Sequence, residues 1–235
     1  MHKIAIPDYA VARAMAQRGR LHLFDAIDGP RTALVVIDLQ NVFMLPGMPV
    51  EVPNARAIVP NVNRLAAALR EAGGKVVWIQ MTAEEDLRAW SVYYDPKTPA
   101  LREALLANIA RGSKGHDLYA ELAVEAGDLT VEKRRYSAFI QGSSDLDAIL
   151  RDLGIDTVVV VGTLTNVCCE STARDAMMLN YKTILVSDAN ATITDEQHNA
   201  TLANILSTFG DVFTTEETIG LLAASGRRRT AEAAE

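Results

Sequence analysis

Cysteine is scarce in this chain of 235 residues, and its 23 lysines and arginines are outnumbered by 30 acidic residues. Its two cysteines, Cys168 and Cys169, are adjacent, and a bridge between neighbours would be strained, so the sequence excludes a disulfide framework. Free thiols are typical of a reducing compartment, and we therefore expect a cytoplasmic protein. The net charge of −7 and the lack of a basic stripe argue against nucleic acid as a partner.

Long apolar runs and clustered histidines are also missing. No apolar stretch approaches the roughly 20 residues that span a bilayer, and the N-terminal segment lacks the apolar core and cleavage site of a signal peptide. We therefore expect no membrane contact. The four histidines, at positions 2, 22, 116 and 198, have no metal-ligand spacing, so we predict no metal and no cofactor.

Short β-branched runs alternate with segments of helical period from residue 32 onward. Strands that read as continuous apolar runs are buried on both faces, and strand–helix alternation is typical of right-handed βαβ units. The pattern predicts an α/β fold, a doubly wound and mainly parallel sheet of about six strands with helices on both faces. The expected strands are 32–38, 75–81, 128–133, 157–162, 182–188 and 211–214, and the expected helices lie near 58–72, 99–110, 146–153, 168–176 and 195–209.

We expect a single domain over residues 31–224. Residues 1–30 form a predicted amphipathic arm, compatible with packing on a neighbouring subunit, and residues 225–235 a polar, frayed C-terminal tail. The polar segment 82–127 is expected to cross the edge of the sheet.

An acid, a base and a thiol follow three of the predicted strands. Asp38 ends the first, Lys133 ends the third, and the fourth runs through Gly162 into the cysteine pair. In open parallel sheets, ligands bind outside the carboxyl ends of the strands. Each residue alone has an ordinary explanation, as a cap, a solvated lysine or a core cysteine. Together, at equivalent strand ends, they predict a catalytic site.

Only one of the two cysteines can face this site, because adjacent residues of a helix point about 100° apart. Cys169 is in register with Thr172, Ala173 and Ala176, a small-residue face that we expect to be buried. Cys168 is therefore the predicted nucleophile and Cys169 a packing residue. At a helix N-terminus, the dipole and the unpaired amides would favour the thiolate and would suit an oxyanion.

Three blocks of sequence resemble the isochorismatase-like cysteine hydrolase superfamily in their order and spacing. They are ALVVIDLQNVF (33–43), VEKRRYSAF (131–139) and GTLTNVCCESTARDA (162–176). The resemblance covers roughly residues 32–215 and implies a Rossmann-like fold. It also implies an Asp–Lys–Cys triad, which falls on Asp38, Lys133 and Cys168.

The same resemblance implies a non-proline cis peptide at Thr163–Leu164. The amides of Leu164 and Cys168 would then form an oxyanion hole. The family usually carries Val after its nucleophile, where Cys169 stands, and Pro after its lysine, where Arg134 stands. The first departure supports a packing role for Cys169, and we interpret the second as local.

The activity that the resemblance implies is hydrolysis of a small amide, ureide or carbamoyl compound through a thioester, with release of ammonia or an amine. Isochorismatases proper lack the cysteine. Nicotinamidases carry an Asp-x-His…His metal site, where this chain has QMTAEEDLRAWSVYY without histidine. The sequence thus favours the N-carbamoylsarcosine and ureidoacrylate type of amidohydrolase, and family members are usually homodimers or homotetramers.

Six residues are candidates for contacts with the substrate, and one alternative to the hydrolase function stays open. Phe43 is equally a core residue, and Arg88, which would suit a carboxylate, is equally an exposed loop arginine. The alternative function is a non-catalytic oligomeric relative or a thiol redox sensor that uses the two cysteines and needs neither Asp38 nor Lys133. The candidate substrate-binding residues are Asn41, Phe43, Gln80, Arg88, Trp90 and Tyr94.

Overall fold

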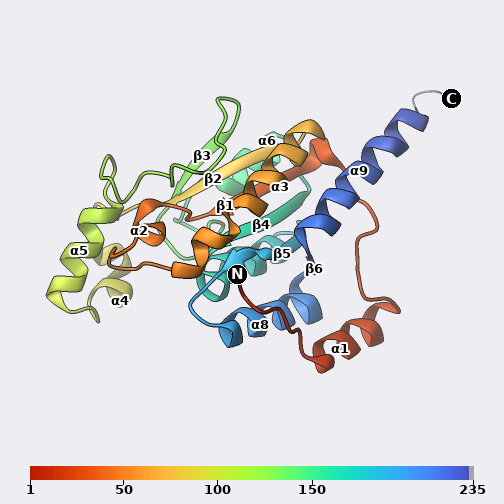
Figure 1. The fold of residues 1–235 in the computed structure, drawn as a ribbon. Helices are drawn as coiled ribbons and strands as arrows, with labels where there is room; N and C mark the ends of the chain where they lie inside the picture. The colour runs from red at the N-terminus through yellow and green to blue at the C-terminus, as the bar shows by residue number, and fades with distance from the viewer. Residues whose placement is uncertain (233–235) are drawn as a thin grey trace.

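Six parallel strands form the centre of the molecule (Figure 1). The computed structural model describes the backbone of residues 1–232 and the side chains of residues 1–225. The sheet order is β3-β2-β1-β4-β5-β6, and every strand pair is parallel. The predicted doubly wound α/β fold is confirmed, with its switch point between β1 and β4. The strands are β1 (Thr32–Ile37), β2 (Lys75–Met81), β3 (Leu129–Lys133), β4 (Thr157–Thr163), β5 (Lys182–Ala191) and β6 (Asp211–Phe213).

The two central strands are buried along their whole length, as their continuous apolar sequences indicate. Successive side chains of a strand point to opposite faces. Leu34 and Val36 of β1 accordingly belong to one core cluster, while Val35 and Ile37 belong to the other. The sheet therefore separates two hydrophobic layers, each covered by helices.

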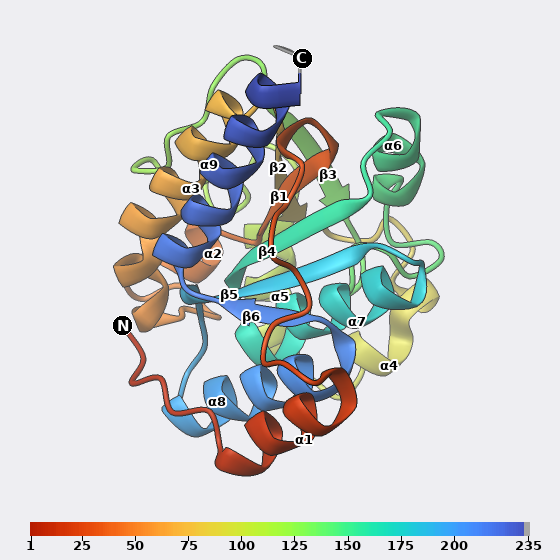
Figure 2. The same cartoon turned by 90° about the vertical axis from the view of Figure 1, so that its right-hand side faces the viewer.

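The helices divide between the two faces of the sheet (Figure 2). One face carries α3 (Val59–Glu71) and α9 (Thr215–Glu232), and the buried stripe of α3 contains Val62, Leu65 and Leu69. The other face carries α6 (Leu146–Asp152), α7 (Glu170–Met178) and α8 (Asp195–Asn204), with α1 (Asp8–Arg18) outside α8.

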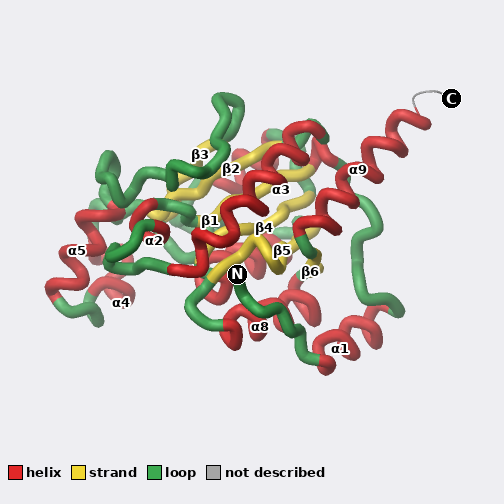
Figure 3. The backbone as a smooth tube through the Cα atoms, in the orientation of Figure 1, coloured by secondary structure: helices red, strands yellow, loops and turns green. Residues whose placement is uncertain are grey.

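The segment between β2 and β3 leaves the sheet, as predicted, and carries most of the long loops (Figure 3). Its helix α5 (Pro99–Ile109) begins after Thr98, whose hydroxyl accepts a hydrogen bond from the Leu101 N–H. The remaining short elements are η1 (Gly29–Arg31), α2 (Asn41–Met44), η2 (Pro53–Ile58), η3 (Leu87–Trp90), α4 (Ser91–Tyr94) and two π-helical turns, η4 (Thr165–Cys169) and η5 (Ile205–Phe209).

Both ends of the chain contain a helix, α1 in the predicted arm and α9 reaching into the predicted tail. The arm contacts its own chain, because the Arg18 guanidinium donates to the carbonyls of Leu206 and Gly210. Contact with a neighbouring subunit stays a prediction. Helix α9 continues to Glu232, so the expected fraying is wrong up to that residue, because alanine and arginine favour a helix. Residues 233–235 lie outside the described residues. Within residues 1–232, no helix combines the length and hydropathy needed to cross a membrane.

Candidate active site

The three residues singled out at the strand ends meet in the structure. Lys133 Nζ lies 2.8 Å from Asp38 Oδ2 and 3.5 Å from Cys168 Sγ. Asp38 and Lys133 are fully buried, and Cys168 is 4% exposed. A carboxylate, an ammonium and a thiol that are hidden from bulk water are thus in direct contact.

Lys133 reaches the other two by crossing the end of a neighbouring strand. It pairs in register with Met81, the last residue of β2, and its Nζ passes 3.6 Å from the Met81 sulfur. The ammonium also donates to the carbonyl of Arg135 at 3.1 Å. These contacts hold the ammonium in one place, between the carboxylate and the thiol.

Asp38 enters the site through an unusual backbone conformation. Its φ of 52° lies in the left-handed region, which aspartate tolerates better than most residues. Beside it, Gly162 of β4 has φ 119°, and a Cβ there would lie 2.1 Å from the carbonyl oxygen of Ile37. Only glycine therefore allows β4 to approach the end of β1 so closely.

Cys168 lies in the π-helical turn η4 rather than at the first residue of a regular helix. Helix α7 begins at Glu170, two residues later than predicted. The Thr163–Leu164 peptide is cis, as the family resemblance implies. The Leu164 carbonyl accepts hydrogen bonds from the N–H groups of Val167 and Cys169, each at 3.1 Å. Cys169 has no exposed surface and packs in the core, which matches its predicted packing role.

The expectation that Cys168 is a thiolate has to be corrected. Burial raises the pKa of Cys168 to about 12, and the opposing effect of the Lys133 charge is partly cancelled by that of Asp38. The helix terminus does not compensate for the loss of water around the sulfur. At neutral pH the resting site therefore holds a neutral thiol.

The carboxylate and the ammonium also have displaced pKa values. Burial raises the pKa of Asp38, although Lys133 opposes the shift. Burial alone would lower the pKa of Lys133, but the negative charge of Asp38 and the contacts with Asp38 and Cys168 outweigh it and raise that pKa. Asp38 is thus a stronger proton acceptor than an exposed aspartate, and Lys133 remains charged.

Cys168 opens into a cavity of about 360 Å³ at the carboxyl ends of the strands. That volume is suited to a small molecule. Its walls are mostly apolar and aromatic. The lining residues are Phe43, Val50, Glu51, Val52, Met81, Tyr93, Lys97, Tyr136, Leu164, Val167, Cys168 and Ile193.

Of the six predicted substrate contacts, Phe43 lines this cavity, where it is 7% exposed. Asn41 turns away, and its amide donates to the Lys114 carbonyl at 2.8 Å. Gln80 donates to the His116 carbonyl at 2.7 Å. Neither amide therefore takes the predicted place in the cavity wall, because backbone carbonyls of the 110–118 loop bind them first.

The three predicted contacts from the 82–94 segment also lie outside the wall. The Arg88 side chain is 90% exposed and pairs with Asp86 at 2.8 Å, so it faces solvent. Trp90 stacks on Tyr93 with ring centroids 4.1 Å apart, behind the cavity wall. Tyr94 is fully buried in the core. Trp90 and Tyr94 thus contact a residue of the cavity wall, Tyr93, but neither of them lines the cavity.

Nine of the twelve wall residues were not predicted as site residues, and these nine include Tyr93, Lys97 and Tyr136, which carry polar or charged groups that could contact a ligand. Tyr93 adjoins Tyr94 in sequence, and Tyr136 lies inside one of the blocks that carry the family resemblance. A signal for Tyr136 was thus available, since it follows Lys133 by three residues. Lys97 had none, because it lies in a polar segment without periodicity.

Comparison with known proteins assigns the family. The isochorismatase domain model matches residues 32–217. The chain belongs to the isochorismatase family. An uncharacterized isochorismatase family protein from Bacillus subtilis (strain 168) is 36% identical over 191 residues, which are 81% of this chain and 94% of that protein. Among the described residues, no group of three or more His, Cys, Asp or Glu side chains is placed to hold a metal ion.

Solved structures of this isochorismatase fold include a cysteine hydrolase from Pseudomonas syringae pv. phaseolicola 1448A, at 31% identity and TM-score 0.77 over 88% of this chain and 98% of that one. N-carbamoylsarcosine amidase from Thermoplasma acidophilum matches at 29% identity and TM-score 0.63, over 79% and 97%. Pyrazinamidase from Pyrococcus horikoshii matches at 25% identity and TM-score 0.65, over 79% and 99%. The N-carbamoylsarcosine type is thus one of several neighbours, and the likeness supports a cysteine hydrolase without selecting a substrate.

Proposed function

We propose that this protein is a cysteine-dependent amidohydrolase that cleaves the C–N bond of a small amide, ureide or carbamoyl compound. The observation that carries the proposal is the contact of three buried groups, of which Cys168 opens into the cavity, with Lys133 Nζ 2.8 Å from Asp38 Oδ2 and 3.5 Å from Cys168 Sγ. The amidases among the structural neighbours support the same reaction class.

In the first half-reaction, Asp38 accepts the proton of the Cys168 thiol as the sulfur attacks the substrate carbonyl. The backbone N–H groups of Leu164 and Cys168 stabilise the oxyanion of the tetrahedral intermediate. Asp38 then returns the proton to the departing nitrogen, and ammonia or an amine leaves. The product of this half-reaction is a thioester on Cys168.

In the second half-reaction, water attacks the thioester carbonyl and gives its proton to Asp38. The intermediate collapses, a carboxylic or carbamic acid leaves, and the sulfur regains the proton from Asp38. One group thus serves as acid and base in turn, for which the raised pKa of Asp38 is suited.

Lys133 makes the proton transfer possible inside a dry site. Before transfer the three groups carry one positive and one negative charge, and afterwards the negative charge has moved from Asp38 to the sulfur. The net charge of the buried site stays zero, so no isolated charge has to be buried. Because Nζ lies near both atoms, it stabilises the negative charge in either place.

A redox sensor fits the same residues less well. A sensor needs an accessible thiol of low pKa and a second thiol to form the disulfide. Burial raises the pKa of Cys168, and Cys169 has no exposed surface. Replacing Asp38 with Asn separates the two functions, because hydrolysis should vanish and thiol oxidation should persist.

Ammonia release from a panel of small amides and ureides tests the proposal. The panel contains N-carbamoylsarcosine, ureidoacrylate, biuret and nicotinamide, and each is run with the wild type and with Cys168→Ala. We expect turnover of at least one compound and a loss of about 10³-fold or more in the variant, since no nucleophile remains. Turnover that survives Cys168→Ala would refute the mechanism. Alkylation of Cys168 by iodoacetamide, located by peptide mass spectrometry, reports whether the thiol is reactive when no panel member is a substrate.

A further inference from the structure

The cavity above Cys168 contains one cation without an acidic partner. Two charged side chains line it, Glu51 and Lys97. Glu51 is already neutralised, because it pairs with Arg56 at 2.9 Å and accepts the Gly47 N–H at 2.8 Å. Among the described residues no acidic side chain acts on Lys97, since burial alone displaces its pKa.

Lys97 is held in position by uncharged groups. Its Nζ donates to the Tyr93 carbonyl and lies 3.3 Å from the centroid of the Tyr93 ring. An ammonium has three protons to donate, so these contacts leave donor capacity unused. Burial lowers the pKa of Lys97, since the ammonium has lost part of its water. A bound anion would stabilise the charged ammonium in place of the lost water and would raise the pKa of Lys97 again.

The other walls define the rest of the ligand. Phe43 and Tyr136 contribute aromatic surface, and Val50 and Ile193 contribute aliphatic surface. Walls of this kind favour an apolar or aromatic body. A single ammonium matches the single negative charge of a carboxylate.

We propose that Lys97 binds the carboxylate of the substrate, so that the substrates are compact amides or ureides with an apolar or aromatic body and a carboxylate at the end remote from the scissile bond. This inference rests on the proposed function, because it assumes that the reacting carbonyl lies at Cys168. It also moves the recognition of a carboxylate from Arg88, which faces solvent, to a residue of the cavity wall.

A pair of thiol reagents tests the inference without a known substrate. The iodoacetamide of para-aminobenzoate carries an aromatic body, a carboxylate and a carbon that alkylates Cys168 with loss of iodide, and its methyl ester lacks only the charge. Peptide mass spectrometry measures the rate at Cys168 for both reagents. We expect the carboxylate reagent to react about tenfold faster or more in the wild type.

Three variants assign the preference to one side chain. Lys97→Met should reduce the rate ratio to about one, and Lys97→Arg should retain most of it. Lys114→Met is the matched control, since Lys114 is exposed and outside the cavity, and it should leave the ratio unchanged. Once a substrate is found, Lys97→Met should raise the KM of the carboxylate form more than that of its ester and change kcat little.

The outcomes distinguish a failure of this inference from a failure of the proposed function. If both reagents alkylate Cys168 at equal rates in the wild type, or if Lys97→Met keeps the preference, the carboxylate subsite is refuted and the nucleophile stands. If neither reagent reacts while both label an unfolded sample, Cys168 is no nucleophile and both proposals fail.

Discussion

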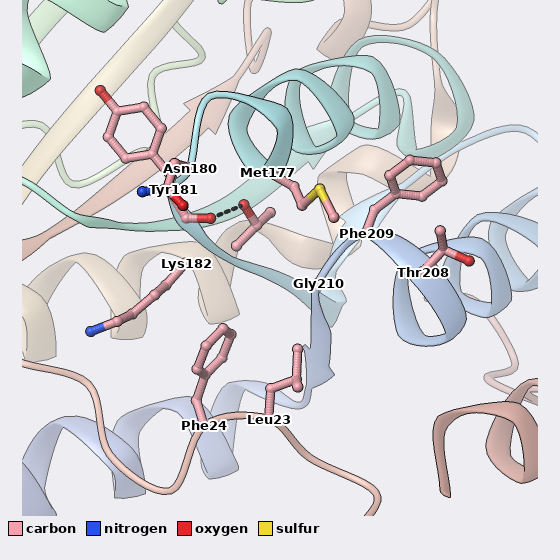
Figure 4. Close-up of a pocket in the computed structure, with 10 residues that line it drawn as sticks. Leu23, Phe24, Met177, Asn180, Tyr181, Lys182, Thr208, Phe209 and Gly210 are labelled. Carbon is pink, nitrogen blue, oxygen red and sulfur yellow. Dashed lines mark hydrogen bonds between the residues drawn. The ribbon is translucent and has the colours of Figure 1, made fainter. Parts of the chain in front are cut away.

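Two hollows of similar size lie at opposite ends of the sheet, and they differ in chemistry. The second has a volume of about 280 Å³ and lies at the start of β5 and β6, where Lys182 and Gly210 line it (Figure 4). Two of its polar side chains are already paired, since Tyr181 donates to Asp147 at 2.7 Å and Lys182 lies 3.5 Å from Asp156. The cavity at the carboxyl ends instead contains a buried thiol in contact with a charged pair. The comparison teaches that reactive groups mark the site better than the size of the hollow does.

Removal of the Lys133 charge should abolish the reactivity that distinguishes the cavity at Cys168 from the second hollow. In Lys133→Met the buried Asp38 carboxylate loses its partner, and turnover should fall by about 10³-fold, since the thiolate is no longer stabilised. The free energy of unfolding should fall by about 3–5 kcal/mol. Turnover of a panel substrate and urea unfolding measure the two effects.

The double variant Asp38→Asn/Lys133→Met separates stability from catalysis. With neither charge present, most of the stability should return while activity stays absent. Near wild-type unfolding of the single variant would mean that the pair is better solvated than its complete burial indicates.

The strand framework and the contact of the three side chains at its carboxyl edge were predictable from the sequence, but the cavity wall was not. Continuous apolar runs such as 157–162 determine a buried strand, and parallel strands bring Asp38, Lys133 and Cys168 to one edge. Tyr93 and Lys97 reach the cavity through loops whose path no periodicity encodes. The pKa of Cys168 was also out of reach, because its direction depends on burial by residues distant in sequence.

The active-site end should also make stability depend on pH. His198 lies behind the cysteine turn, where Nδ1 contacts the Thr165 hydroxyl at 3.0 Å and Nε2 the Ser187 carbonyl at 2.9 Å. Burial lowers the pKa of His198 to about 4. In the unfolded chain it returns to about 6.5, so as the pH falls the unfolded state binds a proton first.

Stability present above pH about 6.5 should therefore be lost as the pH falls toward 4, by about 3 kcal/mol in total from this residue. Urea unfolding at intervals between these pH values measures the loss. His198→Asn, whose amide does not titrate in this range and can still accept from the Thr165 hydroxyl, should give a flatter profile. Equal slopes for the two proteins would assign the acid sensitivity to other groups.

Replacing one methionine in each hollow with leucine should give the smallest effect and compares the two hollows directly. Met81 lies in the active-site cavity with its sulfur 3.6 Å from Lys133 Nζ, and Met177 lies in the second hollow. Leucine conserves the volume of methionine but removes the sulfur, which is a weak acceptor for the ammonium. Met81→Leu should lower kcat/KM several-fold, equivalent to about 1 kcal/mol, and Met177→Leu should leave it unchanged. Steady-state kinetics on one panel substrate compares them directly. An equal effect from both would mean that the substitution acts through general packing, and the contact between Met81 and Lys133 would then have no part in holding the ammonium against the thiol.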